Sequence, residues 1–401
     1  MPTLNVLVVG YGVHRSFGLR ALRGQGHTVG VVDDVAHVPV DFVDWYHPLP
    51  ASSVADPVAL AEASGVAWDV VLCWGEYSLR EAVRFAEALG LPGPRLDVDC
   101  FRDKSLMRAR LAQAGLRVPA YTVTDDPQAA SRWAKELGRA VVVKPVDYAG
   151  SSGVTEVLPG IDAEAAARAA IGKSFTGRCV VEELITGAEV SIESVTWDGR
   201  EHVTYAVTEK RTSARPYFVE TGHIVPAALD DAVNAEVVAT VHAALDAFGM
   251  ERGPSHGEVI LTDGGPVVVE IAGRLGGDLI PVLVHEATGV NLYLEELDAI
   301  AGADRAPATP TARATSAVRF LEAPAGTRVT WPSTGVTAGT VLESTLRDLE
   351  HWYPHYVDAP VVDGAGRRLG YALMTGTRAD VMTSYKLSDR LAPPVSTGGQ
   401  S

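Results

Sequence analysis

The chain has 401 residues, of which 47% are hydrophobic and 21% charged, and its formal net charge is −16. A chain of this length exceeds what one hydrophobic core usually supports, so we expect two or three subdomains with a large buried interior. The excess of acidic residues repels a phosphate backbone and an anionic membrane surface. Nucleic acids and membranes are therefore excluded as expected partners.

The cysteines and the start of the chain indicate a reducing compartment. Cys73, Cys100 and Cys179 are widely spaced and form no CxxC pair, so the sequence suggests neither a disulfide framework nor a thiolate zinc site. The chain runs directly into the apolar stretch Leu4 to Val9 without a basic leader, and no apolar run approaches the roughly 20 residues that span a bilayer. We expect a soluble, cytoplasmic protein.

The first part of the chain alternates apolar strands with helical patterns, which is typical of an open α/β domain. We assign residues 1–97 to this domain. The expected elements are strands at 4–9, 28–32 and 69–73 and helices at 16–23 and 76–89.

Residues 98–302 are predicted to form a second unit, which begins with a helix capped by Asp103. Within it, residues 138–186 resemble a small α+β lid. The expected elements are strands at 140–144, 154–158 and 178–183, helices at 162–171, 232–248 and 291–301, and a hairpin at 256–271.

The last part of the chain begins with a linker rich in Ala, Pro and Thr at 301–316. We expect a β-rich C-terminal subdomain over 303–392. The tail at 393–401 is predicted to be disordered.

The most informative segment is HGEVILTDGGPVVVEIAGR, residues 256–274. Two apolar stretches flank Asp-Gly-Gly at 263–265, which predicts a β-hairpin. With these three residues as the loop, Thr262 faces Pro266, and counting back along both strands fixes the pairing of every other residue.

This register places Glu258 directly opposite Glu270, so that two carboxylates share one face of the hairpin. Hard oxygen ligands at that spacing suit Mg²⁺, which usually takes one or two carboxylates together with phosphate and water. The alternative is a pair of solvated glutamates on an exposed face. Arg274 favours the first interpretation, because an arginine beside a metal–phosphate cluster neutralises charge on a transferred phosphoryl group.

A second candidate segment is VVVKPVDYAGSSGVTEV, residues 141–157. Lys144 ends a strand, and the loop from Ala149 to Gly153, which contains Ser151 and Ser152, can bring backbone N–H groups close to phosphates. The alternative is a flexible hairpin tip.

No Walker loop is present, because Ala167 stands where the first glycine of the motif would precede Gly172-Lys173-Ser174. We interpret Lys173 as a solvated charge at a helix end.

A third segment, CVVEELITGAEVSIES at 179–194, has a break at Thr186-Gly187 between two strands. The end of the first strand can offer backbone groups to adenine, and Glu189 can accept ribose hydroxyls. A hairpin with glutamates at its rim is the alternative.

Taken in order, DKSLMRARLAQAGLRVP, VVVKP, the Gly/Ser loop, EELITGAEVS and the paired-glutamate hairpin ending in Arg274 closely resemble the ATP-grasp superfamily. The resemblance is strong over residues 99–300 and implies an ATP-grasp fold with a Rossmann-like pre-ATP-grasp domain before it. The run TEKRTSARPYFVETGHIVPA at 208–227 and the β-rich extension look like the L-amino acid ligase branch.

The resemblance implies an ATP- and Mg²⁺-dependent ligase that joins an amino acid or related carboxylate to an amine through an acyl phosphate. Family habit adds a homodimer. The implied site residues are Lys104, Lys144, Ser151, Ser152 and Gly153 for phosphates, Glu182, Glu183 and Leu184 for adenine, Glu189 for ribose, Glu258 and Glu270 for Mg²⁺, and Arg274 for the acyl phosphate.

The resemblance places Lys210, Glu220 and His223 near the nucleotide or amino-acid pocket, and Glu76 is expected to reach that pocket from the first domain. Lys210, His223 and Arg274 are the candidate catalytic residues. Glu76, Glu220, His223 and Arg274 are the candidate substrate contacts.

One departure concerns the metal site. Most superfamily members have an asparagine two positions after the second metal glutamate, whereas this chain has Ala272. Small residues also occur there in the amino acid ligase branch. The number of bound metal ions is therefore left open.

Three alternatives remain. An ATP-grasp ligase could use a non-amino-acid carboxylate or another nucleophile, and a non-enzymatic ATP-binding module would keep the nucleotide site without turnover. A dinucleotide-dependent oxidoreductase is suggested by Gly10, Gly12 and Asp33, but Arg15 stands where that fingerprint needs a small residue.

Overall fold

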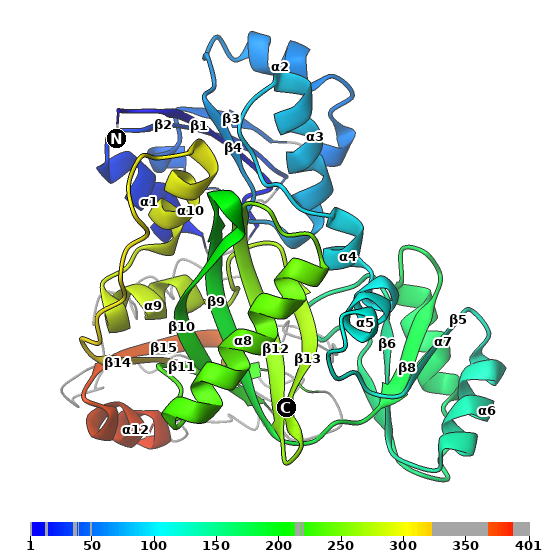
Figure 1. Ribbon diagram of the computed structural model, residues 1–401. Helices are drawn as coiled ribbons and strands as arrows, with labels where there is room; N and C mark the ends of the chain where they lie inside the picture. Colours follow the sequence, from blue (N-terminus) through cyan, green and yellow to red (C-terminus); the bar gives the residue numbers. More distant parts are fainter. Residues whose placement is uncertain are drawn as a thin grey trace, which may run out of the picture.

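The computed structural model describes residues 2–12, 15–34, 38, 40–48, 50–212, 218, 220–322 and 368–387. Three β-sheets follow one another along these residues, and helices pack on each of them (Figure 1). This mixture confirms the predicted α/β and α+β fold class. No helix within the described residues is both long and apolar enough to cross a lipid bilayer.

The first sheet is parallel, with the strand order β3-β2-β1-β4. Alternate residues of β1 belong to two different cores, one containing Leu19 and Leu22 of α1 and the other containing Phe85 of α3. A parallel sheet covered on both faces explains the continuous apolar strands of the sequence. Its elements are β1 (Asn5–Val9), α1 (Ser16–Gly24), β2 (Thr28–Val32), η1 (Val40–Phe42), β3 (Trp45–His47), η2 (Ala51–Ser53), α2 (Pro57–Ala63), β4 (Val70–Leu72), η3 (Glu76–Ser78) and α3 (Leu79–Leu89).

Two short helices, α4 (Val98–Arg102) and α5 (Lys104–Gln113), lead into the second sheet. Asp103 caps α5 as predicted, because its carboxylate accepts the N–H groups of Ser105 and Leu106.

The second sheet is antiparallel, with the order β5-β8-β6-β7. Alanines of α6 and α7 form its core together with valines of the strands, so both helices approach the sheet closely. The sheet begins at Tyr121, before the expected start of the lid at residue 138. Its elements are β5 (Tyr121–Thr124), α6 (Pro127–Leu137), β6 (Val141–Pro145), β7 (Thr155–Val157), α7 (Glu164–Lys173) and β8 (Cys179–Glu183).

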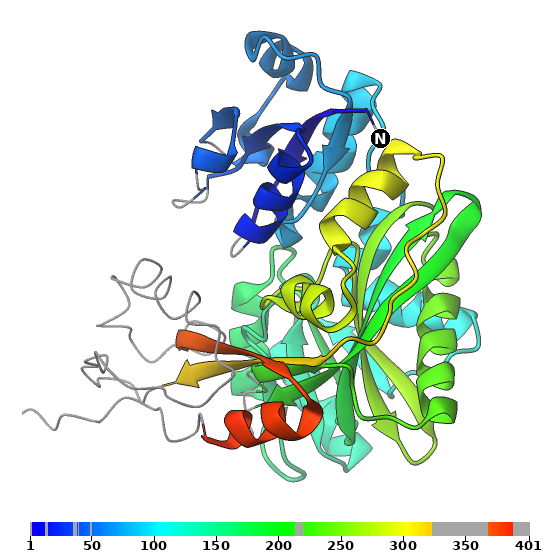
Figure 2. The ribbon, with the colours of Figure 1, turned by 90° about the vertical axis from the view of Figure 1, so that its left-hand side faces the viewer.

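The third sheet is the largest, with seven antiparallel strands in the order β13-β12-β9-β10-β11-β14-β15. Figure 2 shows α8 on one side of this sheet and α9 on the other. Its elements are β9 (Ala188–Trp197), η4 (Asp198–Arg200), β10 (Glu201–Thr212), β11 (Glu220–Val225), α8 (Asp231–Ala247), β12 (Gly253–Thr262), β13 (Gly265–Ala272), α9 (Ile280–Thr288), α10 (Leu292–Ala301), β14 (Thr315–Glu322), β15 (Arg368–Gly376) and α12 (Arg378–Leu387).

The C-terminal strands extend the central sheet. β14 pairs with β11 and β15 pairs with β14, so the described part of residues 303–392 is continuous with the preceding unit. The tail predicted at 393–401 lies outside the described residues.

The hairpin differs from the prediction in two ways that cancel. Thr262 pairs with Gly265, so the turn has two residues rather than the expected three, and the expected pairing of Thr262 with Pro266 is wrong. A β-bulge between Glu258 and Val259 then returns the missing residue. Glu258 consequently still pairs with Glu270, as predicted.

The glycines of the first domain give a stability prediction. A Cβ on Gly30 would overlap the ring of Trp68, whereas a Cβ on Gly24 would meet nothing within 4 Å. We expect Gly30→Ala to lower the free energy of unfolding by about 1–3 kcal/mol, because it overpacks the core. Gly24→Ala should leave it unchanged or raise it by up to about 1 kcal/mol. Urea unfolding of both variants checks this, and equal effects would contradict it.

Candidate active site

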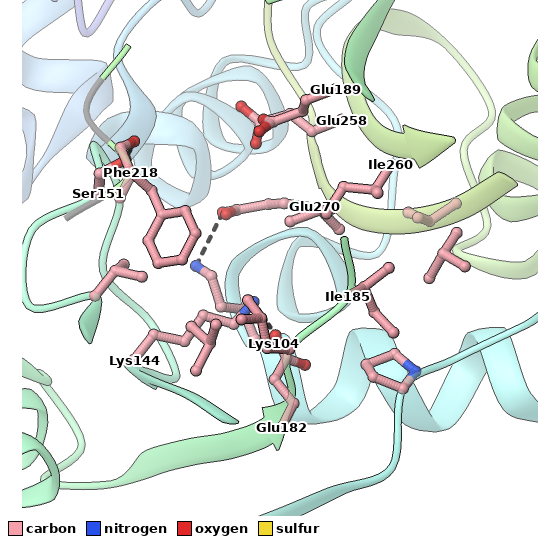
Figure 3. Close-up of a pocket in the computed structure, with 18 of the residues that line it drawn as sticks. Lys104, Lys144, Ser151, Glu182, Ile185, Glu189, Phe218, Glu258, Ile260 and Glu270 are labelled. Carbon is pink, nitrogen blue, oxygen red and sulfur yellow. Dashed lines mark hydrogen bonds and ion pairs between the residues drawn. The ribbon is translucent and has the colours of Figure 1, made fainter. Parts of the chain in front are cut away.

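A pocket lies between the second sheet and the central sheet, and residues of α5 also line it (Figure 3). It brings together eleven of the predicted site residues. These are Lys104, Lys144, Ser151, Glu182, Glu183, Leu184, Glu189, Lys210, Glu220, Glu258 and Glu270. The predicted residues Glu76, Ser152, Gly153, His223 and Arg274 do not line this pocket.

On the side of the second sheet, the Glu182 carboxylate is fully engaged by two cations. Arg108 donates to both of its oxygens at 2.8 and 3.2 Å, and Lys144 forms an ion pair with it. Burial alone would raise the pKa of Glu182, but Arg108 and Lys144 outweigh burial and hold that pKa at about 2. Arg108 was missed from the sequence, although it lies one helical turn after Lys104 on α5.

The predicted adenine contacts stay predictions. Leu184 lines the pocket, and its N–H donates to the carbonyl of Ala140 because pairing with residue 140 continues past the end of β8. The carboxylate of Glu183 is 2.5 Å from Arg139, at the surface.

Lys210 lies at the centre of the opposite wall. Its ammonium is 2.7 Å from Glu189, 2.7 Å from Glu258 and 2.9 Å from Glu220, and its side chain is 2% exposed. Burial would lower the pKa of Lys210, but the three carboxylates raise it well above its usual value. One buried cation thus joins the predicted ribose, metal and substrate glutamates.

His256 connects Glu258 to a second carboxylate, Glu193. Nε2 of His256 is 3.3 Å from Glu258, and its Nδ1 is 2.9 Å from the buried Glu193. Burial would lower the pKa of His256, but Glu193 and Glu258 raise it to about 9. Glu193 and His256 were not predicted from the sequence, because they become neighbours only when β9 pairs with β12.

Glu270 faces Glu258 and receives its own cation, since Nζ of Lys104 is 3.0 Å from Glu270 and 2.9 Å from the carbonyl of Tyr148. The dashed line in Figure 3 marks the Lys104–Glu270 contact. Both glutamates line the pocket with about a fifth of their side chains exposed, 22% and 23%. Two adjacent oxygen donors open to a pocket fit a hard cation such as Mg²⁺.

Arg274 lies just beyond the pocket and is held by the first domain. Its Nε forms an ion pair with Glu76, whose other oxygen pairs with Arg102. Burial would raise the pKa of Glu76, but Arg274 and Arg102 keep it below its usual value. Glu76 was predicted to reach the nucleotide or amino-acid pocket from the first domain; it contacts Arg274 but does not line the pocket between the two sheets, and its contact with a substrate stays a prediction.

His223 on β11 lies in a second cluster with Asp278 and with Glu220, which also lines the pocket. One ligand atom of each lies within 4.8 Å of the others, and Nε2 of His223 is 3.3 Å from Asp278. Nδ1 of His223 is buried without a hydrogen-bond partner in the described part of the chain. Asp278, which has a positive φ of 54°, was not predicted.

The Gly/Ser loop divides its residues between two environments. Ser151 lines the pocket and donates to the carbonyl of Phe218 at 3.2 Å. Ser152 instead accepts a hydrogen bond from Lys173 at 2.6 Å, and a Cβ on Gly153 would be 3.1 Å from both Pro145 and Lys173. Lys173 is therefore not the solvated charge that we expected, because the loop folds back on the end of α7.

The glycines after β1 have a packing role. A Cβ on Gly10 would overlap Ser78, and the carboxylate of Asp33 accepts the N–H of Gly12 at 2.9 Å. Asp33, the acidic residue that a dinucleotide fingerprint would use, is thus already bonded to the turn after β1. This geometry disfavours the oxidoreductase alternative.

Comparison with known proteins identifies one domain of the chain and several relatives. Residues 137–282 match the ATP-grasp domain family. Alanine–anticapsin ligase of Bacillus subtilis is 26% identical over 65% of this chain and 60% of its own length. Dapdiamide A synthase of Enterobacter agglomerans is 25% identical over 47% of this chain and 46% of its own length. The chain thus spans only about half the length of such relatives.

Among solved structures, the L-amino acid ligase from Bacillus licheniformis superposes with a TM-score of 0.79 at 22% identity, covering 97% of both chains. At this identity the likeness shows the fold. Residues 137–282 therefore form an ATP-grasp domain, the described residues share the fold of the solved L-amino acid ligase, and the sequence resembles alanine–anticapsin ligase.

Proposed function

We propose that this protein is an ATP-dependent carboxylate–amine ligase that joins an amino acid or related carboxylate to an amine or a second amino acid. The observation that carries the proposal is the facing pair Glu258 and Glu270, open to a pocket that also contains Lys104 and Lys144. The named relatives, an alanine–anticapsin ligase, a dapdiamide A synthase and an L-amino acid ligase, support it.

In this proposal, ATP occupies the pocket between the two sheets. Lys104 and Lys144 bind its phosphates, and Ser151 covers them from the Gly/Ser loop. Glu189 binds the ribose. Glu258 and Glu270 would hold Mg²⁺, which would supply positive charge to balance that of the phosphates.

The first step forms an acyl phosphate. A carboxylate oxygen of the substrate attacks the γ-phosphorus of ATP, the bond from that phosphorus to the β–γ bridging oxygen breaks, and ADP leaves. Arg274 donates to the phosphoryl oxygens of the acyl phosphate. Since Glu76 and the carbonyl of Leu275 already hold the Arg274 guanidinium, it needs little reorganisation as charge develops.

The second step forms the amide. The amine nitrogen attacks the acyl carbon, the bond from that carbon to the phosphate oxygen breaks, and phosphate leaves. The carboxylates of Glu220 and Asp278, which lie beside His223, provide the negative charge that binds the amine while it is still an ammonium group. His223 takes that proton or acts as a hydrogen-bonding contact to the substrate.

Because an acyl phosphate hydrolyses in water, the second sheet is expected to close over the pocket during turnover. Lys144 and Ser151 would move with it, whereas Arg274 and both metal glutamates belong to the central sheet unit. The homodimer and the cytoplasmic location remain predictions from the sequence. Light scattering of the purified chain would test the dimer.

The reaction itself can be tested with the purified chain, ATP and Mg²⁺ across a matrix of amino acids and amines. We expect phosphate release that depends on an acceptor, matched by a product whose mass equals two substrates minus water. Phosphate release and mass spectrometry measure the two quantities. Release without any product of that mass would contradict the ligase, and no phosphate release under any condition would favour a nucleotide-binding module.

Removing the Arg274 guanidinium should lower turnover strongly. We expect Arg274→Ala to reduce kcat by about 100- to 1000-fold, which is the usual cost of one preorganised donor to developing charge. The matched control is Arg95→Ala, which removes an exposed guanidinium paired with Glu251 outside the pocket. Similar kcat values for the two variants would sink the role given to Arg274.

Replacing a metal glutamate should change the Mg²⁺ requirement. We expect Glu270→Gln to raise the Mg²⁺ concentration for half-maximal turnover by at least about tenfold, because one charged oxygen ligand is lost. EDTA should abolish turnover of the unaltered chain. Magnesium titrations of Glu270→Gln and of the exposed control Glu251→Gln provide the measurement, and parallel curves would argue against a metal at this position.

A further inference from the structure

Arg15 is a buried cation that makes its hydrogen bonds at the boundary between the first domain and the central sheet unit. It immediately precedes α1 and is 5% exposed. Its guanidinium donates to the carbonyls of Gly276 at 2.6 Å and Leu275 at 3.0 Å, with longer contacts to the carbonyl of Trp74 and the hydroxyl of Tyr293. Within the described ranges, no carboxylate lies within ion-pair distance of Arg15.

These contacts converge on the segment that directly follows Arg274. The carbonyl of Leu275 accepts from Nη1 of Arg274 at 2.8 Å and from Nη2 of Arg15 at 3.0 Å. The Arg274 guanidinium is therefore held at two points, by Glu76 and by Leu275. Arg15 fixes the second of these points.

The same segment also packs against His256, which contacts Glu258, and against Glu193. A Cβ on Gly276 would be 2.8 Å from Glu193 and 3.0 Å from His256, so the backbone lies directly on this pair. Because Arg15 donates to the carbonyl of Gly276, it holds this segment next to His256 and Glu193, which are already bonded to each other. A buried guanidinium with several donors in one plane suits this task.

We propose that Arg15 is a positioning residue for Arg274: by binding the carbonyls of Leu275 and Gly276, it sets the direction in which Arg274 meets the acyl phosphate. This inference rests on the role proposed for Arg274. It gives the first domain a part in catalysis that does not depend on Glu76 alone. It also assigns a purpose to the large residue that occupies the dinucleotide-fingerprint position.

The test compares Arg15→Met, Arg15→Lys and the matched control Arg20→Met. Arg20 lies on the same helix, is exposed, and its guanidinium sits over the ring of Phe42. Hydrogen exchange followed by mass spectrometry should show faster exchange at 274–277 in Arg15→Met, unchanged exchange at 256–262, and no change in Arg20→Met. Unchanged exchange at 274–277 in Arg15→Met would overturn the proposal.

The kinetic readout separates positioning from stability. Arg15→Met should lower kcat by about 100-fold, as a small misplacement of a catalytic group does, while the KM for ATP stays within about twofold. Arg15→Lys should recover part of the loss. Should Arg15→Met fail to fold, Arg15→Lys carries the same comparisons.

A double-mutant cycle with Arg274→Ala decides whether Arg15 acts through Arg274. In the Arg274→Ala background, adding Arg15→Met should lower kcat by less than about threefold, because no guanidinium is left to position. An equal loss in both backgrounds would overturn the proposal. A chain without ligase activity would overturn the proposed function instead, and hydrogen exchange would still report whether Arg15 holds the segment.

Discussion

The facing pair Glu258 and Glu270 is the constraint around which the rest of the site is arranged. Two carboxylates at this spacing repel each other by about 3 kcal/mol at an effective dielectric near 20. The fold meets this repulsion by giving each carboxylate its own cations, Lys210 and His256 for Glu258 and Lys104 for Glu270. Because both carboxylates already have cationic partners, a metal ion that binds here must arrive together with negative charge. A nucleoside triphosphate supplies that negative charge.

On the second-sheet side of the pocket, a buried carboxylate is also paired with cations, but the pairing has a different consequence. Glu182 is buried with Arg108 and Lys144, and such a group contributes little net stability because desolvation offsets most of the attraction. What it provides is geometry: the ammonium of Lys144 is kept at the pocket with its charge partly balanced. A phosphate can then compete for Lys144 without first desolvating it.

The sequence was sufficient for patterns that depend on local chemistry. The facing glutamates were predicted although the turn and the bulge were both missed, because the two errors cancel. Lys173 was misassigned, since nothing local indicates that the Gly/Ser loop folds back on the end of α7. The contacts of Arg15 and the support of Glu258 by His256 depend on distances between elements far apart in the chain. Residue spacing carries no information on such distances.

The site draws its groups from three parts of the chain. Lys144 and Ser151 belong to the small sheet, which meets the central sheet at the break near Gly187 between β8 and β9. Arg274 is tied to the first domain through Glu76, so we expect it to keep its position if the small sheet moves. Closure would thus change how the phosphates are covered while leaving the acyl-phosphate contacts in place. The proposed ligase reaction needs this division, because it must protect a water-sensitive intermediate without disturbing the groups that react.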